Sequence, residues 1–302
     1  MLRLVDGNEV DNASIAPNQS RILFVTVAVQ SRKKIPSTVK HKFRVDATDP
    51  FNNQAKTFHY VIAPTSMSDD RPPIFSPSLN GPGWLASQGA CCGPGTHESA
   101  VFGLDGKLQA AERYAVDWIK IGASGRICHG DPLVLSNWFG YGAKVRAASS
   151  GRVVVAIDGH PDQTPLQKPP GTPFEGAPGN HVVIKQPDGL REVYAHLVPG
   201  SLKVNIGDRV HAGQTIGRLG NSGASLAPHL HFHVVNGRHA ARSDGYPYVL
   251  DRFKLAAQSN LETLGKALEG KAAFPRRDQL NPVKHQRELP LNFTIDNFPN
   301  LP

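Results

Sequence analysis

The chain of 302 residues lacks a long apolar run. No stretch approaches the roughly 18 consecutive apolar residues that a membrane-spanning helix needs. The first residues, 1–6, contain no apolar core of the kind found in a secretory signal peptide. The sequence therefore predicts no transmembrane segment, and it is expected to belong either to a cytosolic protein or to an exported one whose signal has been removed.

Cysteine is scarce, with only Cys91, Cys92 and Cys128. Three cysteines do not make a disulfide framework, although one bridge from Cys91 or Cys92 to Cys128 stays open in an oxidising compartment. The adjacent pair is poorly spaced for a zinc site built from thiolates. We therefore interpret the cysteines as buried or singly bridged rather than functional.

Methionine is also scarce, and the charged residues are not concentrated in one part of the chain. The net charge of +8 is spread along the chain, whereas nucleic-acid-binding proteins gather basic residues in a patch. The even basic excess fits mild attraction to a polyanionic matrix. Met1 and Met67 are the two methionines, and neither flanks a lysine on a tight hairpin. Nucleic-acid binding and a lipoyl- or biotinyl-type carrier function are both excluded.

Glycine (29 residues) and proline (25 residues) are abundant, which is typical of a turn-rich, mainly β protein. Residues 1–66 contain β-branched, apolar runs at 21–29, 42–47 and 57–62, and predict a small β-sandwich-like domain. Residues 67–83 are rich in Pro, Ser, Asp and Gly and are expected to form a linker.

From residue 84 the texture changes, and residues 84–253 are predicted to form a second domain built on an antiparallel sheet. Glycines recur there beside short apolar runs, and a proline- and glycine-rich loop at 158–179 is either the wall of a substrate groove or a passive insertion. The expected strands are 144–147, 152–157, 181–185, 192–196 and 215–219.

Residues 254–302 are expected to form an extension to this domain. Apolar positions at 255, 261, 264 and 268 predict a helix over 255–268. The run 289–295 predicts a strand that completes a sheet in one of the earlier domains.

A cluster of histidines is the strongest chemical signal. Successive strand residues alternate between faces, so His229, His231 and His233 are expected to project from one side of a sheet. Imidazole is the commonest protein ligand of zinc, and three on one face are hard to explain as core packing. With His97, Asp117 and His196 upstream, the chain offers a His, Asp, His ligand set and two further histidines.

Several short motifs in a fixed order resemble the lysostaphin-type (LytM-like) zinc metallopeptidases, which are peptidoglycan endopeptidases. The resemblance spans about residues 81–253 and implies an antiparallel-sheet peptidase domain of that type. The motifs stand at 141–147, 150–153, 179–184, 194–197, 207–217, 221–223 and 229–232.

Carried over residue by residue, the resemblance implies one zinc ion per chain, bound by His97, Asp117 and His231. It implies that His196 and His229 are the catalytic histidines, one as general base and the other as stabiliser of the oxyanion, without deciding between them.

Two departures from the family pattern concern histidines. Many members place the first ligand pair four residues apart, whereas His97 and Asp117 are twenty apart, so His129 is a rival for the first ligand. The position that is often acidic or an amide in the family is His233 here, which we expect behind His231 or facing solvent.

The resemblance implies a secreted or periplasmic enzyme that cuts peptidoglycan cross-links, or another glycine-rich peptide, through a metal-activated water. One alternative is a non-catalytic relative that binds or regulates envelope partners, but such a protein is expected to lack a ligand or catalytic histidine, and all five have candidates. Storage of transition metals is a third hypothesis that the scattered histidines do not support.

Overall fold

The protein is described by a computed structural model over residues 2–4, 14–16, 23–25, 35–49, 51–68, 70–89, 97, 100–104, 106–167, 176–240, 242–269, 273–274 and 282–300. Within these residues β-strands dominate, and a single α-helix accompanies them. The prediction of a mainly β protein with antiparallel sheets is confirmed. Among the described residues, no helix combines the length and the apolarity that crossing a bilayer requires.

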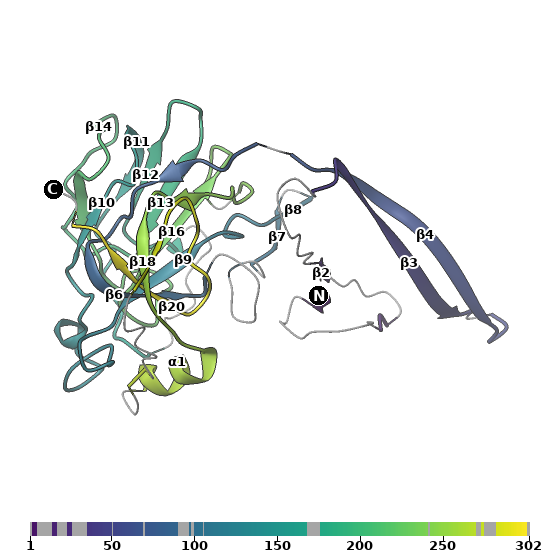
Figure 1. The fold of residues 1–302 in the computed structure, drawn as a ribbon, viewed down its shortest axis with the longest axis horizontal. Helices are drawn as coiled ribbons and strands as arrows, with labels where there is room; N and C mark the ends of the chain where they lie inside the picture. Colours follow the sequence, from purple (N-terminus) through teal and green to yellow (C-terminus); the bar gives the residue numbers. More distant parts are fainter. Residues whose placement is uncertain are drawn as a thin grey trace.

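A ten-stranded sheet forms the body of the molecule, and every neighbouring pair in it is antiparallel (Figure 1). Its strands, in spatial order, are β14 (Arg209–Val210), β11 (Gly151–Ile157), β12 (His181–Lys185), β13 (Arg191–Ala195), β16 (Leu230–Val235), β9 (Val116–Lys120), β6 (Gly81–Ser87), β20 (Thr294–Phe298), β18 (Phe253–Gln258) and β19 (Val283–His285).

Three small sheets lie around this body. They pair β10 (Lys144–Arg146) with β15 (Thr215–Arg218), β17 (Val249–Leu250) with β5 (Ile74–Phe75), and β7 (Phe102–Leu104) with β8 (Lys107–Gln109). The strand β5 falls inside the expected linker 67–83, where Phe75 and Leu79 are buried in the core. The later part of that segment is therefore packed, and not merely a connection.

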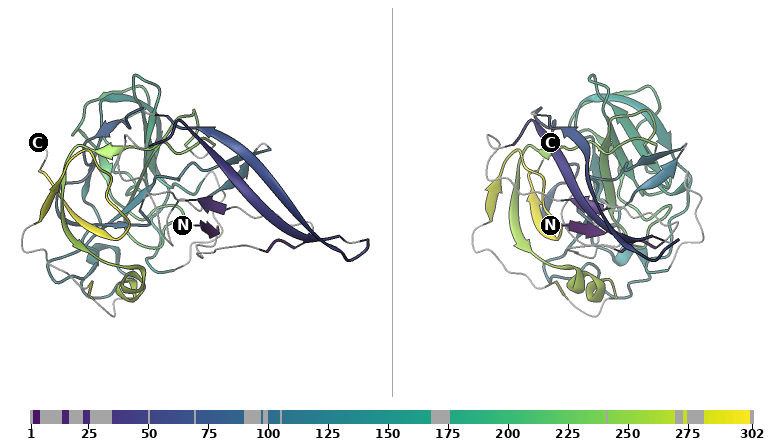
Figure 2. Two further views of the ribbon diagram at one scale, coloured as in Figure 1. Left: turned by 45° about the vertical axis from the view of Figure 1, so that its right-hand side comes forward. Right: turned by 90° about the vertical axis from the view of Figure 1, so that its right-hand side faces the viewer.

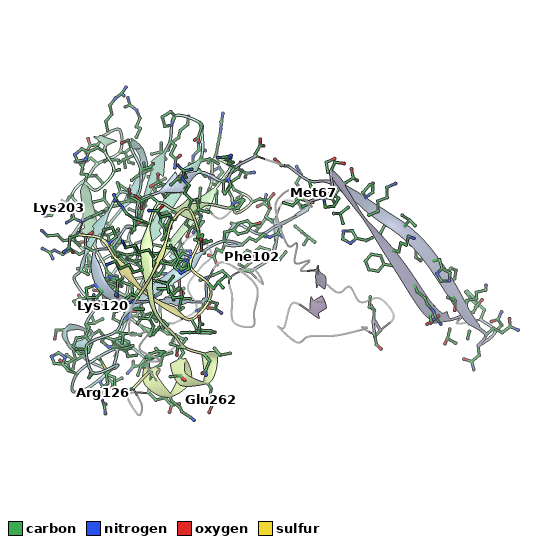
Figure 3. The ribbon with its side chains drawn as sticks, in the orientation of Figure 1. Met67, Phe102, Lys120, Arg126, Lys203 and Glu262 are labelled. Carbon is green, nitrogen blue, oxygen red and sulfur yellow. The ribbon has the colours of Figure 1, made fainter. Side chains whose placement is uncertain are left out.

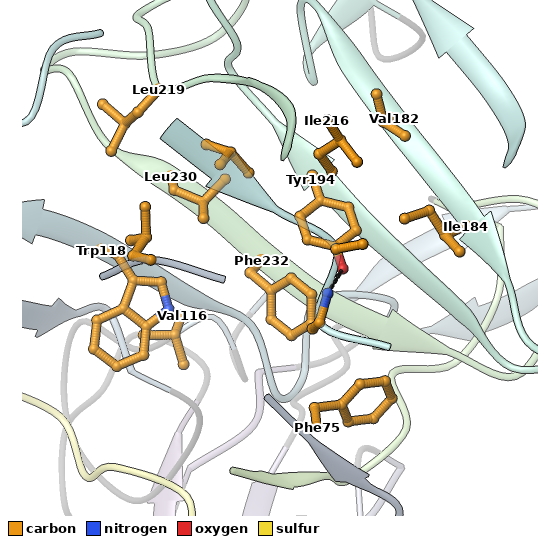
Figure 4. Close-up of a cluster of buried hydrophobic side chains, with 14 of the residues drawn as sticks. Phe75, Val116, Trp118, Val182, Ile184, Tyr194, Ile216, Leu219, Leu230 and Phe232 are labelled. Carbon is orange, nitrogen blue, oxygen red and sulfur yellow. Dashed lines mark hydrogen bonds between the residues drawn. The ribbon is translucent and has the colours of Figure 1, made fainter. Parts of the chain in front are cut away.

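The main hydrophobic core lies against one face of the sheet. Because side chains of a strand alternate, β16 directs Leu230, Phe232 and Val234 into this core and leaves the three histidines on its other face. Figure 4 shows Phe232 beside Tyr194, whose hydroxyl accepts a 2.7 Å hydrogen bond from the amide of Ala148.

The N-terminal part differs from the predicted β-sandwich. Here β1 (Leu2–Leu4) pairs with β2 (Leu23–Val25), and β3 (Thr38–Thr48) pairs with β4 (Ala55–Ser66) in a long hairpin that extends away from the body (Figures 1 and 2). Met67 stands where the hairpin meets the body (Figure 3). A sandwich needs two sheets that bury each other's apolar faces. Nearly all described side chains of β3 and β4 are exposed or half-buried, so the sandwich is not confirmed.

The predicted helix over 255–268 is wrong in its first half. Residues up to Gln258 form β18, and the helix α1 spans only Leu261–Leu268. Asn260 caps it, its side chain accepting a 2.9 Å hydrogen bond from the amide of Thr263. The predicted strand at 289–295 is shifted to β20, which joins the main sheet between β6 and β18.

Candidate metal centre

Two neighbouring strands bring the central pair of the site together. Asp117 of β9 lies directly opposite His231 of β16, and Ala195 of β13 lies opposite His231 on its other side. The polar residues therefore occupy the face of the sheet turned away from the main core. His97 follows β6, and its Nδ1 lies 2.7 Å from the carbonyl oxygen of Gln88.

Three of the histidines predicted from the sequence converge on one carboxylate oxygen of Asp117. Asp117 Oδ1 lies 2.9 Å from His231 Nδ1, 3.4 Å from His229 Nε2 and 3.5 Å from His97 Nε2. The ligand atoms of His97, Asp117 and His231 lie within 4.8 Å of one another, as do those of His196, His229 and His231. Two overlapping groups that could hold a metal ion thus share His231.

Backbone carbonyls determine which ring nitrogen faces inward. A carbonyl oxygen can only accept a hydrogen bond, so the nitrogen beside it carries the hydrogen and the other nitrogen keeps its lone pair when the ring is neutral. In each case Nδ1 donates over 2.7 Å and Nε2 is left for the site: His97 to Gln88, His196 to Ser222, and His229 to Ala227.

This arrangement needs a cation. When neutral, the rings of His97 and His229 turn lone pairs, not hydrogens, toward the buried carboxylate of Asp117. Burial favours the neutral carboxyl, but positive charge on the rings of His229 and then His97 outweighs burial and holds the pKa of Asp117 well below its ordinary value. The carboxylate therefore requires positive charge beside it, from protonated rings or from a metal ion. Two imidazoles and a carboxylate with no thiolate suit zinc, so the residues present fit the metal that the resemblance implies.

Close contact between two loops orients His196. This residue follows β13 with a φ of 62°, a left-handed conformation that non-glycine residues seldom adopt. Its ring is anchored to the carbonyl of Ser222, in the loop that touches 176–179. A Cβ on Gly223 would lie 2.4 Å from the amide nitrogen of Gly179, so only glycine fits there.

Burial and neighbouring charges separate the titration of the histidines. Burial, reinforced by the charges of His229 and His231, holds the pKa of His196 well below its ordinary value, which keeps the ring neutral. Burial alone would also lower the pKa of His231, but the hydrogen bond and charge of Asp117 raise it. Burial holds the pKa of His233 well below its ordinary value.

The site opens into a cavity of about 520 Å³. Ala177 and Pro178 are among its lining residues, so the loop 158–179 contributes to the wall, one of the two alternatives that its sequence leaves open. Phe102, Leu264 and Glu112 also line it, and no sequence motif indicates that they belong to the site. These three come from β7, α1 and the turn before β9, and only the tertiary fold reveals that they meet.

The structure separates His97 from its rival. His129 lies in a different cavity of about 290 Å³ beside Cys128, with its Nδ1 2.7 Å from the carbonyl of Asn137 and its ring stacked on Phe139. The fold thus brings His97, and not His129, to Asp117. Cys128 is a buried free thiol, whereas Cys91 and Cys92 lie outside the described residues.

His233 lies behind His231 and not in solvent. It is 4% exposed, and its Nδ1 is 2.9 Å from Nε2 of His231. Of the two expected positions for His233, the geometry matches the one behind His231.

Comparison with known proteins finds a family match over the segment that holds three of the site histidines. Residues 139–242 match the family described as Peptidase family M23. This segment contains His196, His229 and His231, while His97 and Asp117 precede it.

Individual proteins also resemble parts of this chain. The chain is 40% identical over 92 residues to the glycyl-glycine endopeptidase ALE-1 of Staphylococcus capitis, covering 30% of this chain and 21% of that protein. It is 44% identical over 62 residues to the peptidoglycan DD-endopeptidase ShyC of Vibrio cholerae, covering 20% and 14%. The catalytic domain of lysostaphin from Staphylococcus simulans is 27% identical, with 48% and 80% covered and a TM-score of 0.29. The matched part is thus at most about a fifth of either of these two curated relatives.

Proposed function

Because the chain carries a peptidase family M23 domain over residues 139–242, we propose that it is a zinc-dependent endopeptidase that hydrolyses peptide cross-links of bacterial peptidoglycan. The observation that carries this proposal is the convergence of His97, Asp117 and His231, with His196 and His229 beside them in one cavity. The two curated relatives named above, a glycyl-glycine endopeptidase and a peptidoglycan DD-endopeptidase, support the same reaction class.

The zinc ion would be held by Nε2 of His97, a carboxylate oxygen of Asp117 and Nδ1 of His231. Three protein ligands are typical of a catalytic zinc, which keeps a further position open. Bound zinc lowers the pKa of a water molecule to about 7 and polarises a carbonyl group. Burial of all three side chains excludes bulk water from the ligand set and strengthens electrostatic interactions there.

His196 and His229 would move protons. Each donates its Nδ1 hydrogen to a carbonyl and presents a lone pair on Nε2, so each can accept a proton from water. Once protonated, that ring can donate to the oxyanion or to the leaving amine. The ring centroids lie 4.6 Å apart, close enough for both rings to serve one reacting centre.

The wall of the cavity suits a peptide whose residues next to the scissile bond are uncharged. Much of this wall consists of alanines and other apolar side chains, which add few polar contacts: Ala100, Ala177, Ala195, Ala224, Ala227 and Ala240 are among them. A peptidoglycan cross-link or another glycine-rich peptide is the substrate class that we propose. Since that polymer lies outside the cytoplasmic membrane, we propose a secreted or periplasmic location.

Digestion of purified peptidoglycan tests the function. The zinc-loaded protein is incubated with peptidoglycans of several cross-link types, and the fragments are identified by mass spectrometry. We expect new amino and carboxyl ends within the cross-links, and none with His229→Ala. Intact cross-links of every type, with zinc bound, would instead favour a non-catalytic envelope-binding relative.

A further inference from the structure

His231 is held differently from the other histidines of the site. Whereas the rings of His97, His196 and His229 each donate to a backbone carbonyl, the outer nitrogen of His231 faces another imidazole. The Nε2 atom of His231 lies 2.9 Å from Nδ1 of His233. In turn, Nε2 of His233 lies 3.3 Å from the carbonyl oxygen of Ala240.

The carbonyl of Ala240 determines which atoms donate in this series of hydrogen bonds, which we call the relay. Because it can only accept, Nε2 of His233 carries the hydrogen, and the neutral ring of His233 offers a lone pair on Nδ1. His231 must then donate from Nε2, which leaves Nδ1 of His231 directed at Asp117. Thus the backbone carbonyl of Ala240, which does not belong to the proposed ligand set, determines which nitrogen of His231 is available for the metal.

Asp117 favours the opposite placement of the hydrogen on the ring of His231. Its carboxylate lies 2.9 Å from Nδ1 of His231 and favours a hydrogen on that nitrogen. Without an acceptor behind the ring, His231 would place its hydrogen on Nδ1 and donate it to the carboxylate. A second hydrogen-bond acceptor, held in place at 4% exposure, is therefore needed to keep a hydrogen on Nε2.

We propose that His233 is a positioning residue that relays the carbonyl of Ala240 to His231 and so keeps Nδ1 of His231 available as a metal ligand. Histidine suits this position because, when one ring nitrogen donates to a carbonyl, the other nitrogen of the neutral ring accepts a hydrogen bond. A carboxylate there would also accept from His231, but it would add a second buried negative charge beside Asp117. The effect on zinc rests on the function proposed above, whereas the hydrogen bond itself does not.

Nuclear magnetic resonance of the full chain with ¹⁵N-labelled histidine tests the relay. We expect a hydrogen on Nε2 of His231 and a coupling across the hydrogen bond to Nδ1 of His233, in the metal-free protein and with zinc. In His233→Leu the hydrogen should move to Nδ1 of His231. Absence of the coupling in the unmodified chain, or an unchanged His231 in His233→Leu, would overturn the proposal.

Zinc affinity gives the second readout. Loss of the relay should weaken zinc binding by about 10- to 100-fold in His233→Leu. His233→Gln retains a neutral acceptor and a donor, so it should restore affinity to near that of the unmodified chain. The matched control is His129→Leu, outside the site. Equal loss in the Leu and Gln variants would overturn the relay. If the unmodified chain binds no zinc, the proposed function is wrong. The coupling between His231 and His233 then still shows whether the relay exists.

Discussion

Asp117 and His231 lie directly opposite each other on adjacent antiparallel strands, with Asp117 Oδ1 2.9 Å from His231 Nδ1. Backbone pairing, and not a loop, therefore fixes the distance between these two groups. A shift of either strand by one residue would turn one of the two side chains to the other face of the sheet. The register between β9 and β16 is thus part of the candidate site.

Replacement of Asp117 by alanine is expected to abolish stoichiometric zinc binding, because it removes the only carboxylate of the ligand set. His97→Ala and His231→Ala should also lose the metal. Elemental analysis of the purified, dialysed variants measures this directly, with His129→Ala as the matched control that retains zinc. Full zinc content in Asp117→Ala would show that the assignment of ligands is wrong.

Replacement of His196 or His229 by alanine is expected to leave zinc bound while hydrolysis falls by about 10² to 10⁴. The reason is that each presents its lone pair beside the ligand set without belonging to it. Rates on a soluble peptide and zinc content are measured on the same preparations.

The same two variants also distinguish between the overlapping groups of ligand atoms. Should zinc be lost from both His196→Ala and His229→Ala but retained in His97→Ala, the metal would belong to the group of three histidines instead.

A chain that begins at Asp70 is expected to fold with a melting temperature close to that of the whole chain and to hydrolyse soluble peptides. The strands β3 and β4 pair with each other and not with the main sheet. A chain that begins at Gly81 also loses Phe75 and Leu79, and removal of one large buried side chain alone costs about 3–5 kcal/mol.

Thermal unfolding followed by circular dichroism compares these two truncations. A folded, zinc-loaded chain from Asp70 without any activity would indicate that the N-terminal part shapes the substrate groove.

Replacement of Asp296 by asparagine is expected to stabilise the protein above neutral pH. Burial raises the pKa of this carboxyl to about 7, and among the described residues its Oδ1 has no hydrogen-bond partner. The folded state thus retains a proton that the unfolded state releases near pH 4, so the unfolding free energy falls as pH rises from about 4 to about 7 and levels off above that.

Urea unfolding at several pH values measures this linkage. The stability of Asp296→Asn relative to the unmodified chain should increase between about pH 4 and pH 7, by about 1.4 kcal/mol for each unit of pKa difference. The exposed Asp188→Asn serves as control. A difference that does not change with pH would contradict the prediction.

The sequence was sufficient to predict strands with clear apolar alternation, such as β12, which begins and ends where expected. It also identified the five polar side chains that the fold gathers in one cavity, because histidine-rich motifs are local signals. It failed at β18, where apolar spacing is compatible with a helix, whereas the capping residue Asn260 marks where α1 begins. The backbone carbonyls that orient the histidines, such as that of Ser222, could not be predicted, because every residue has a carbonyl group.

The position of β20 between β6 and β18 has a consequence for folding. Residues 294–298 pair with residues 81–87 across more than 200 positions of the chain, and β6 in turn pairs with β9, which carries Asp117. Contacts between such distant segments make folding slow. Until residue 298 has emerged, β6 and β18 both present unpaired edges that can join other chains. The protein is therefore expected to depend on rapid late pairing, or on protection of these edges, during its synthesis.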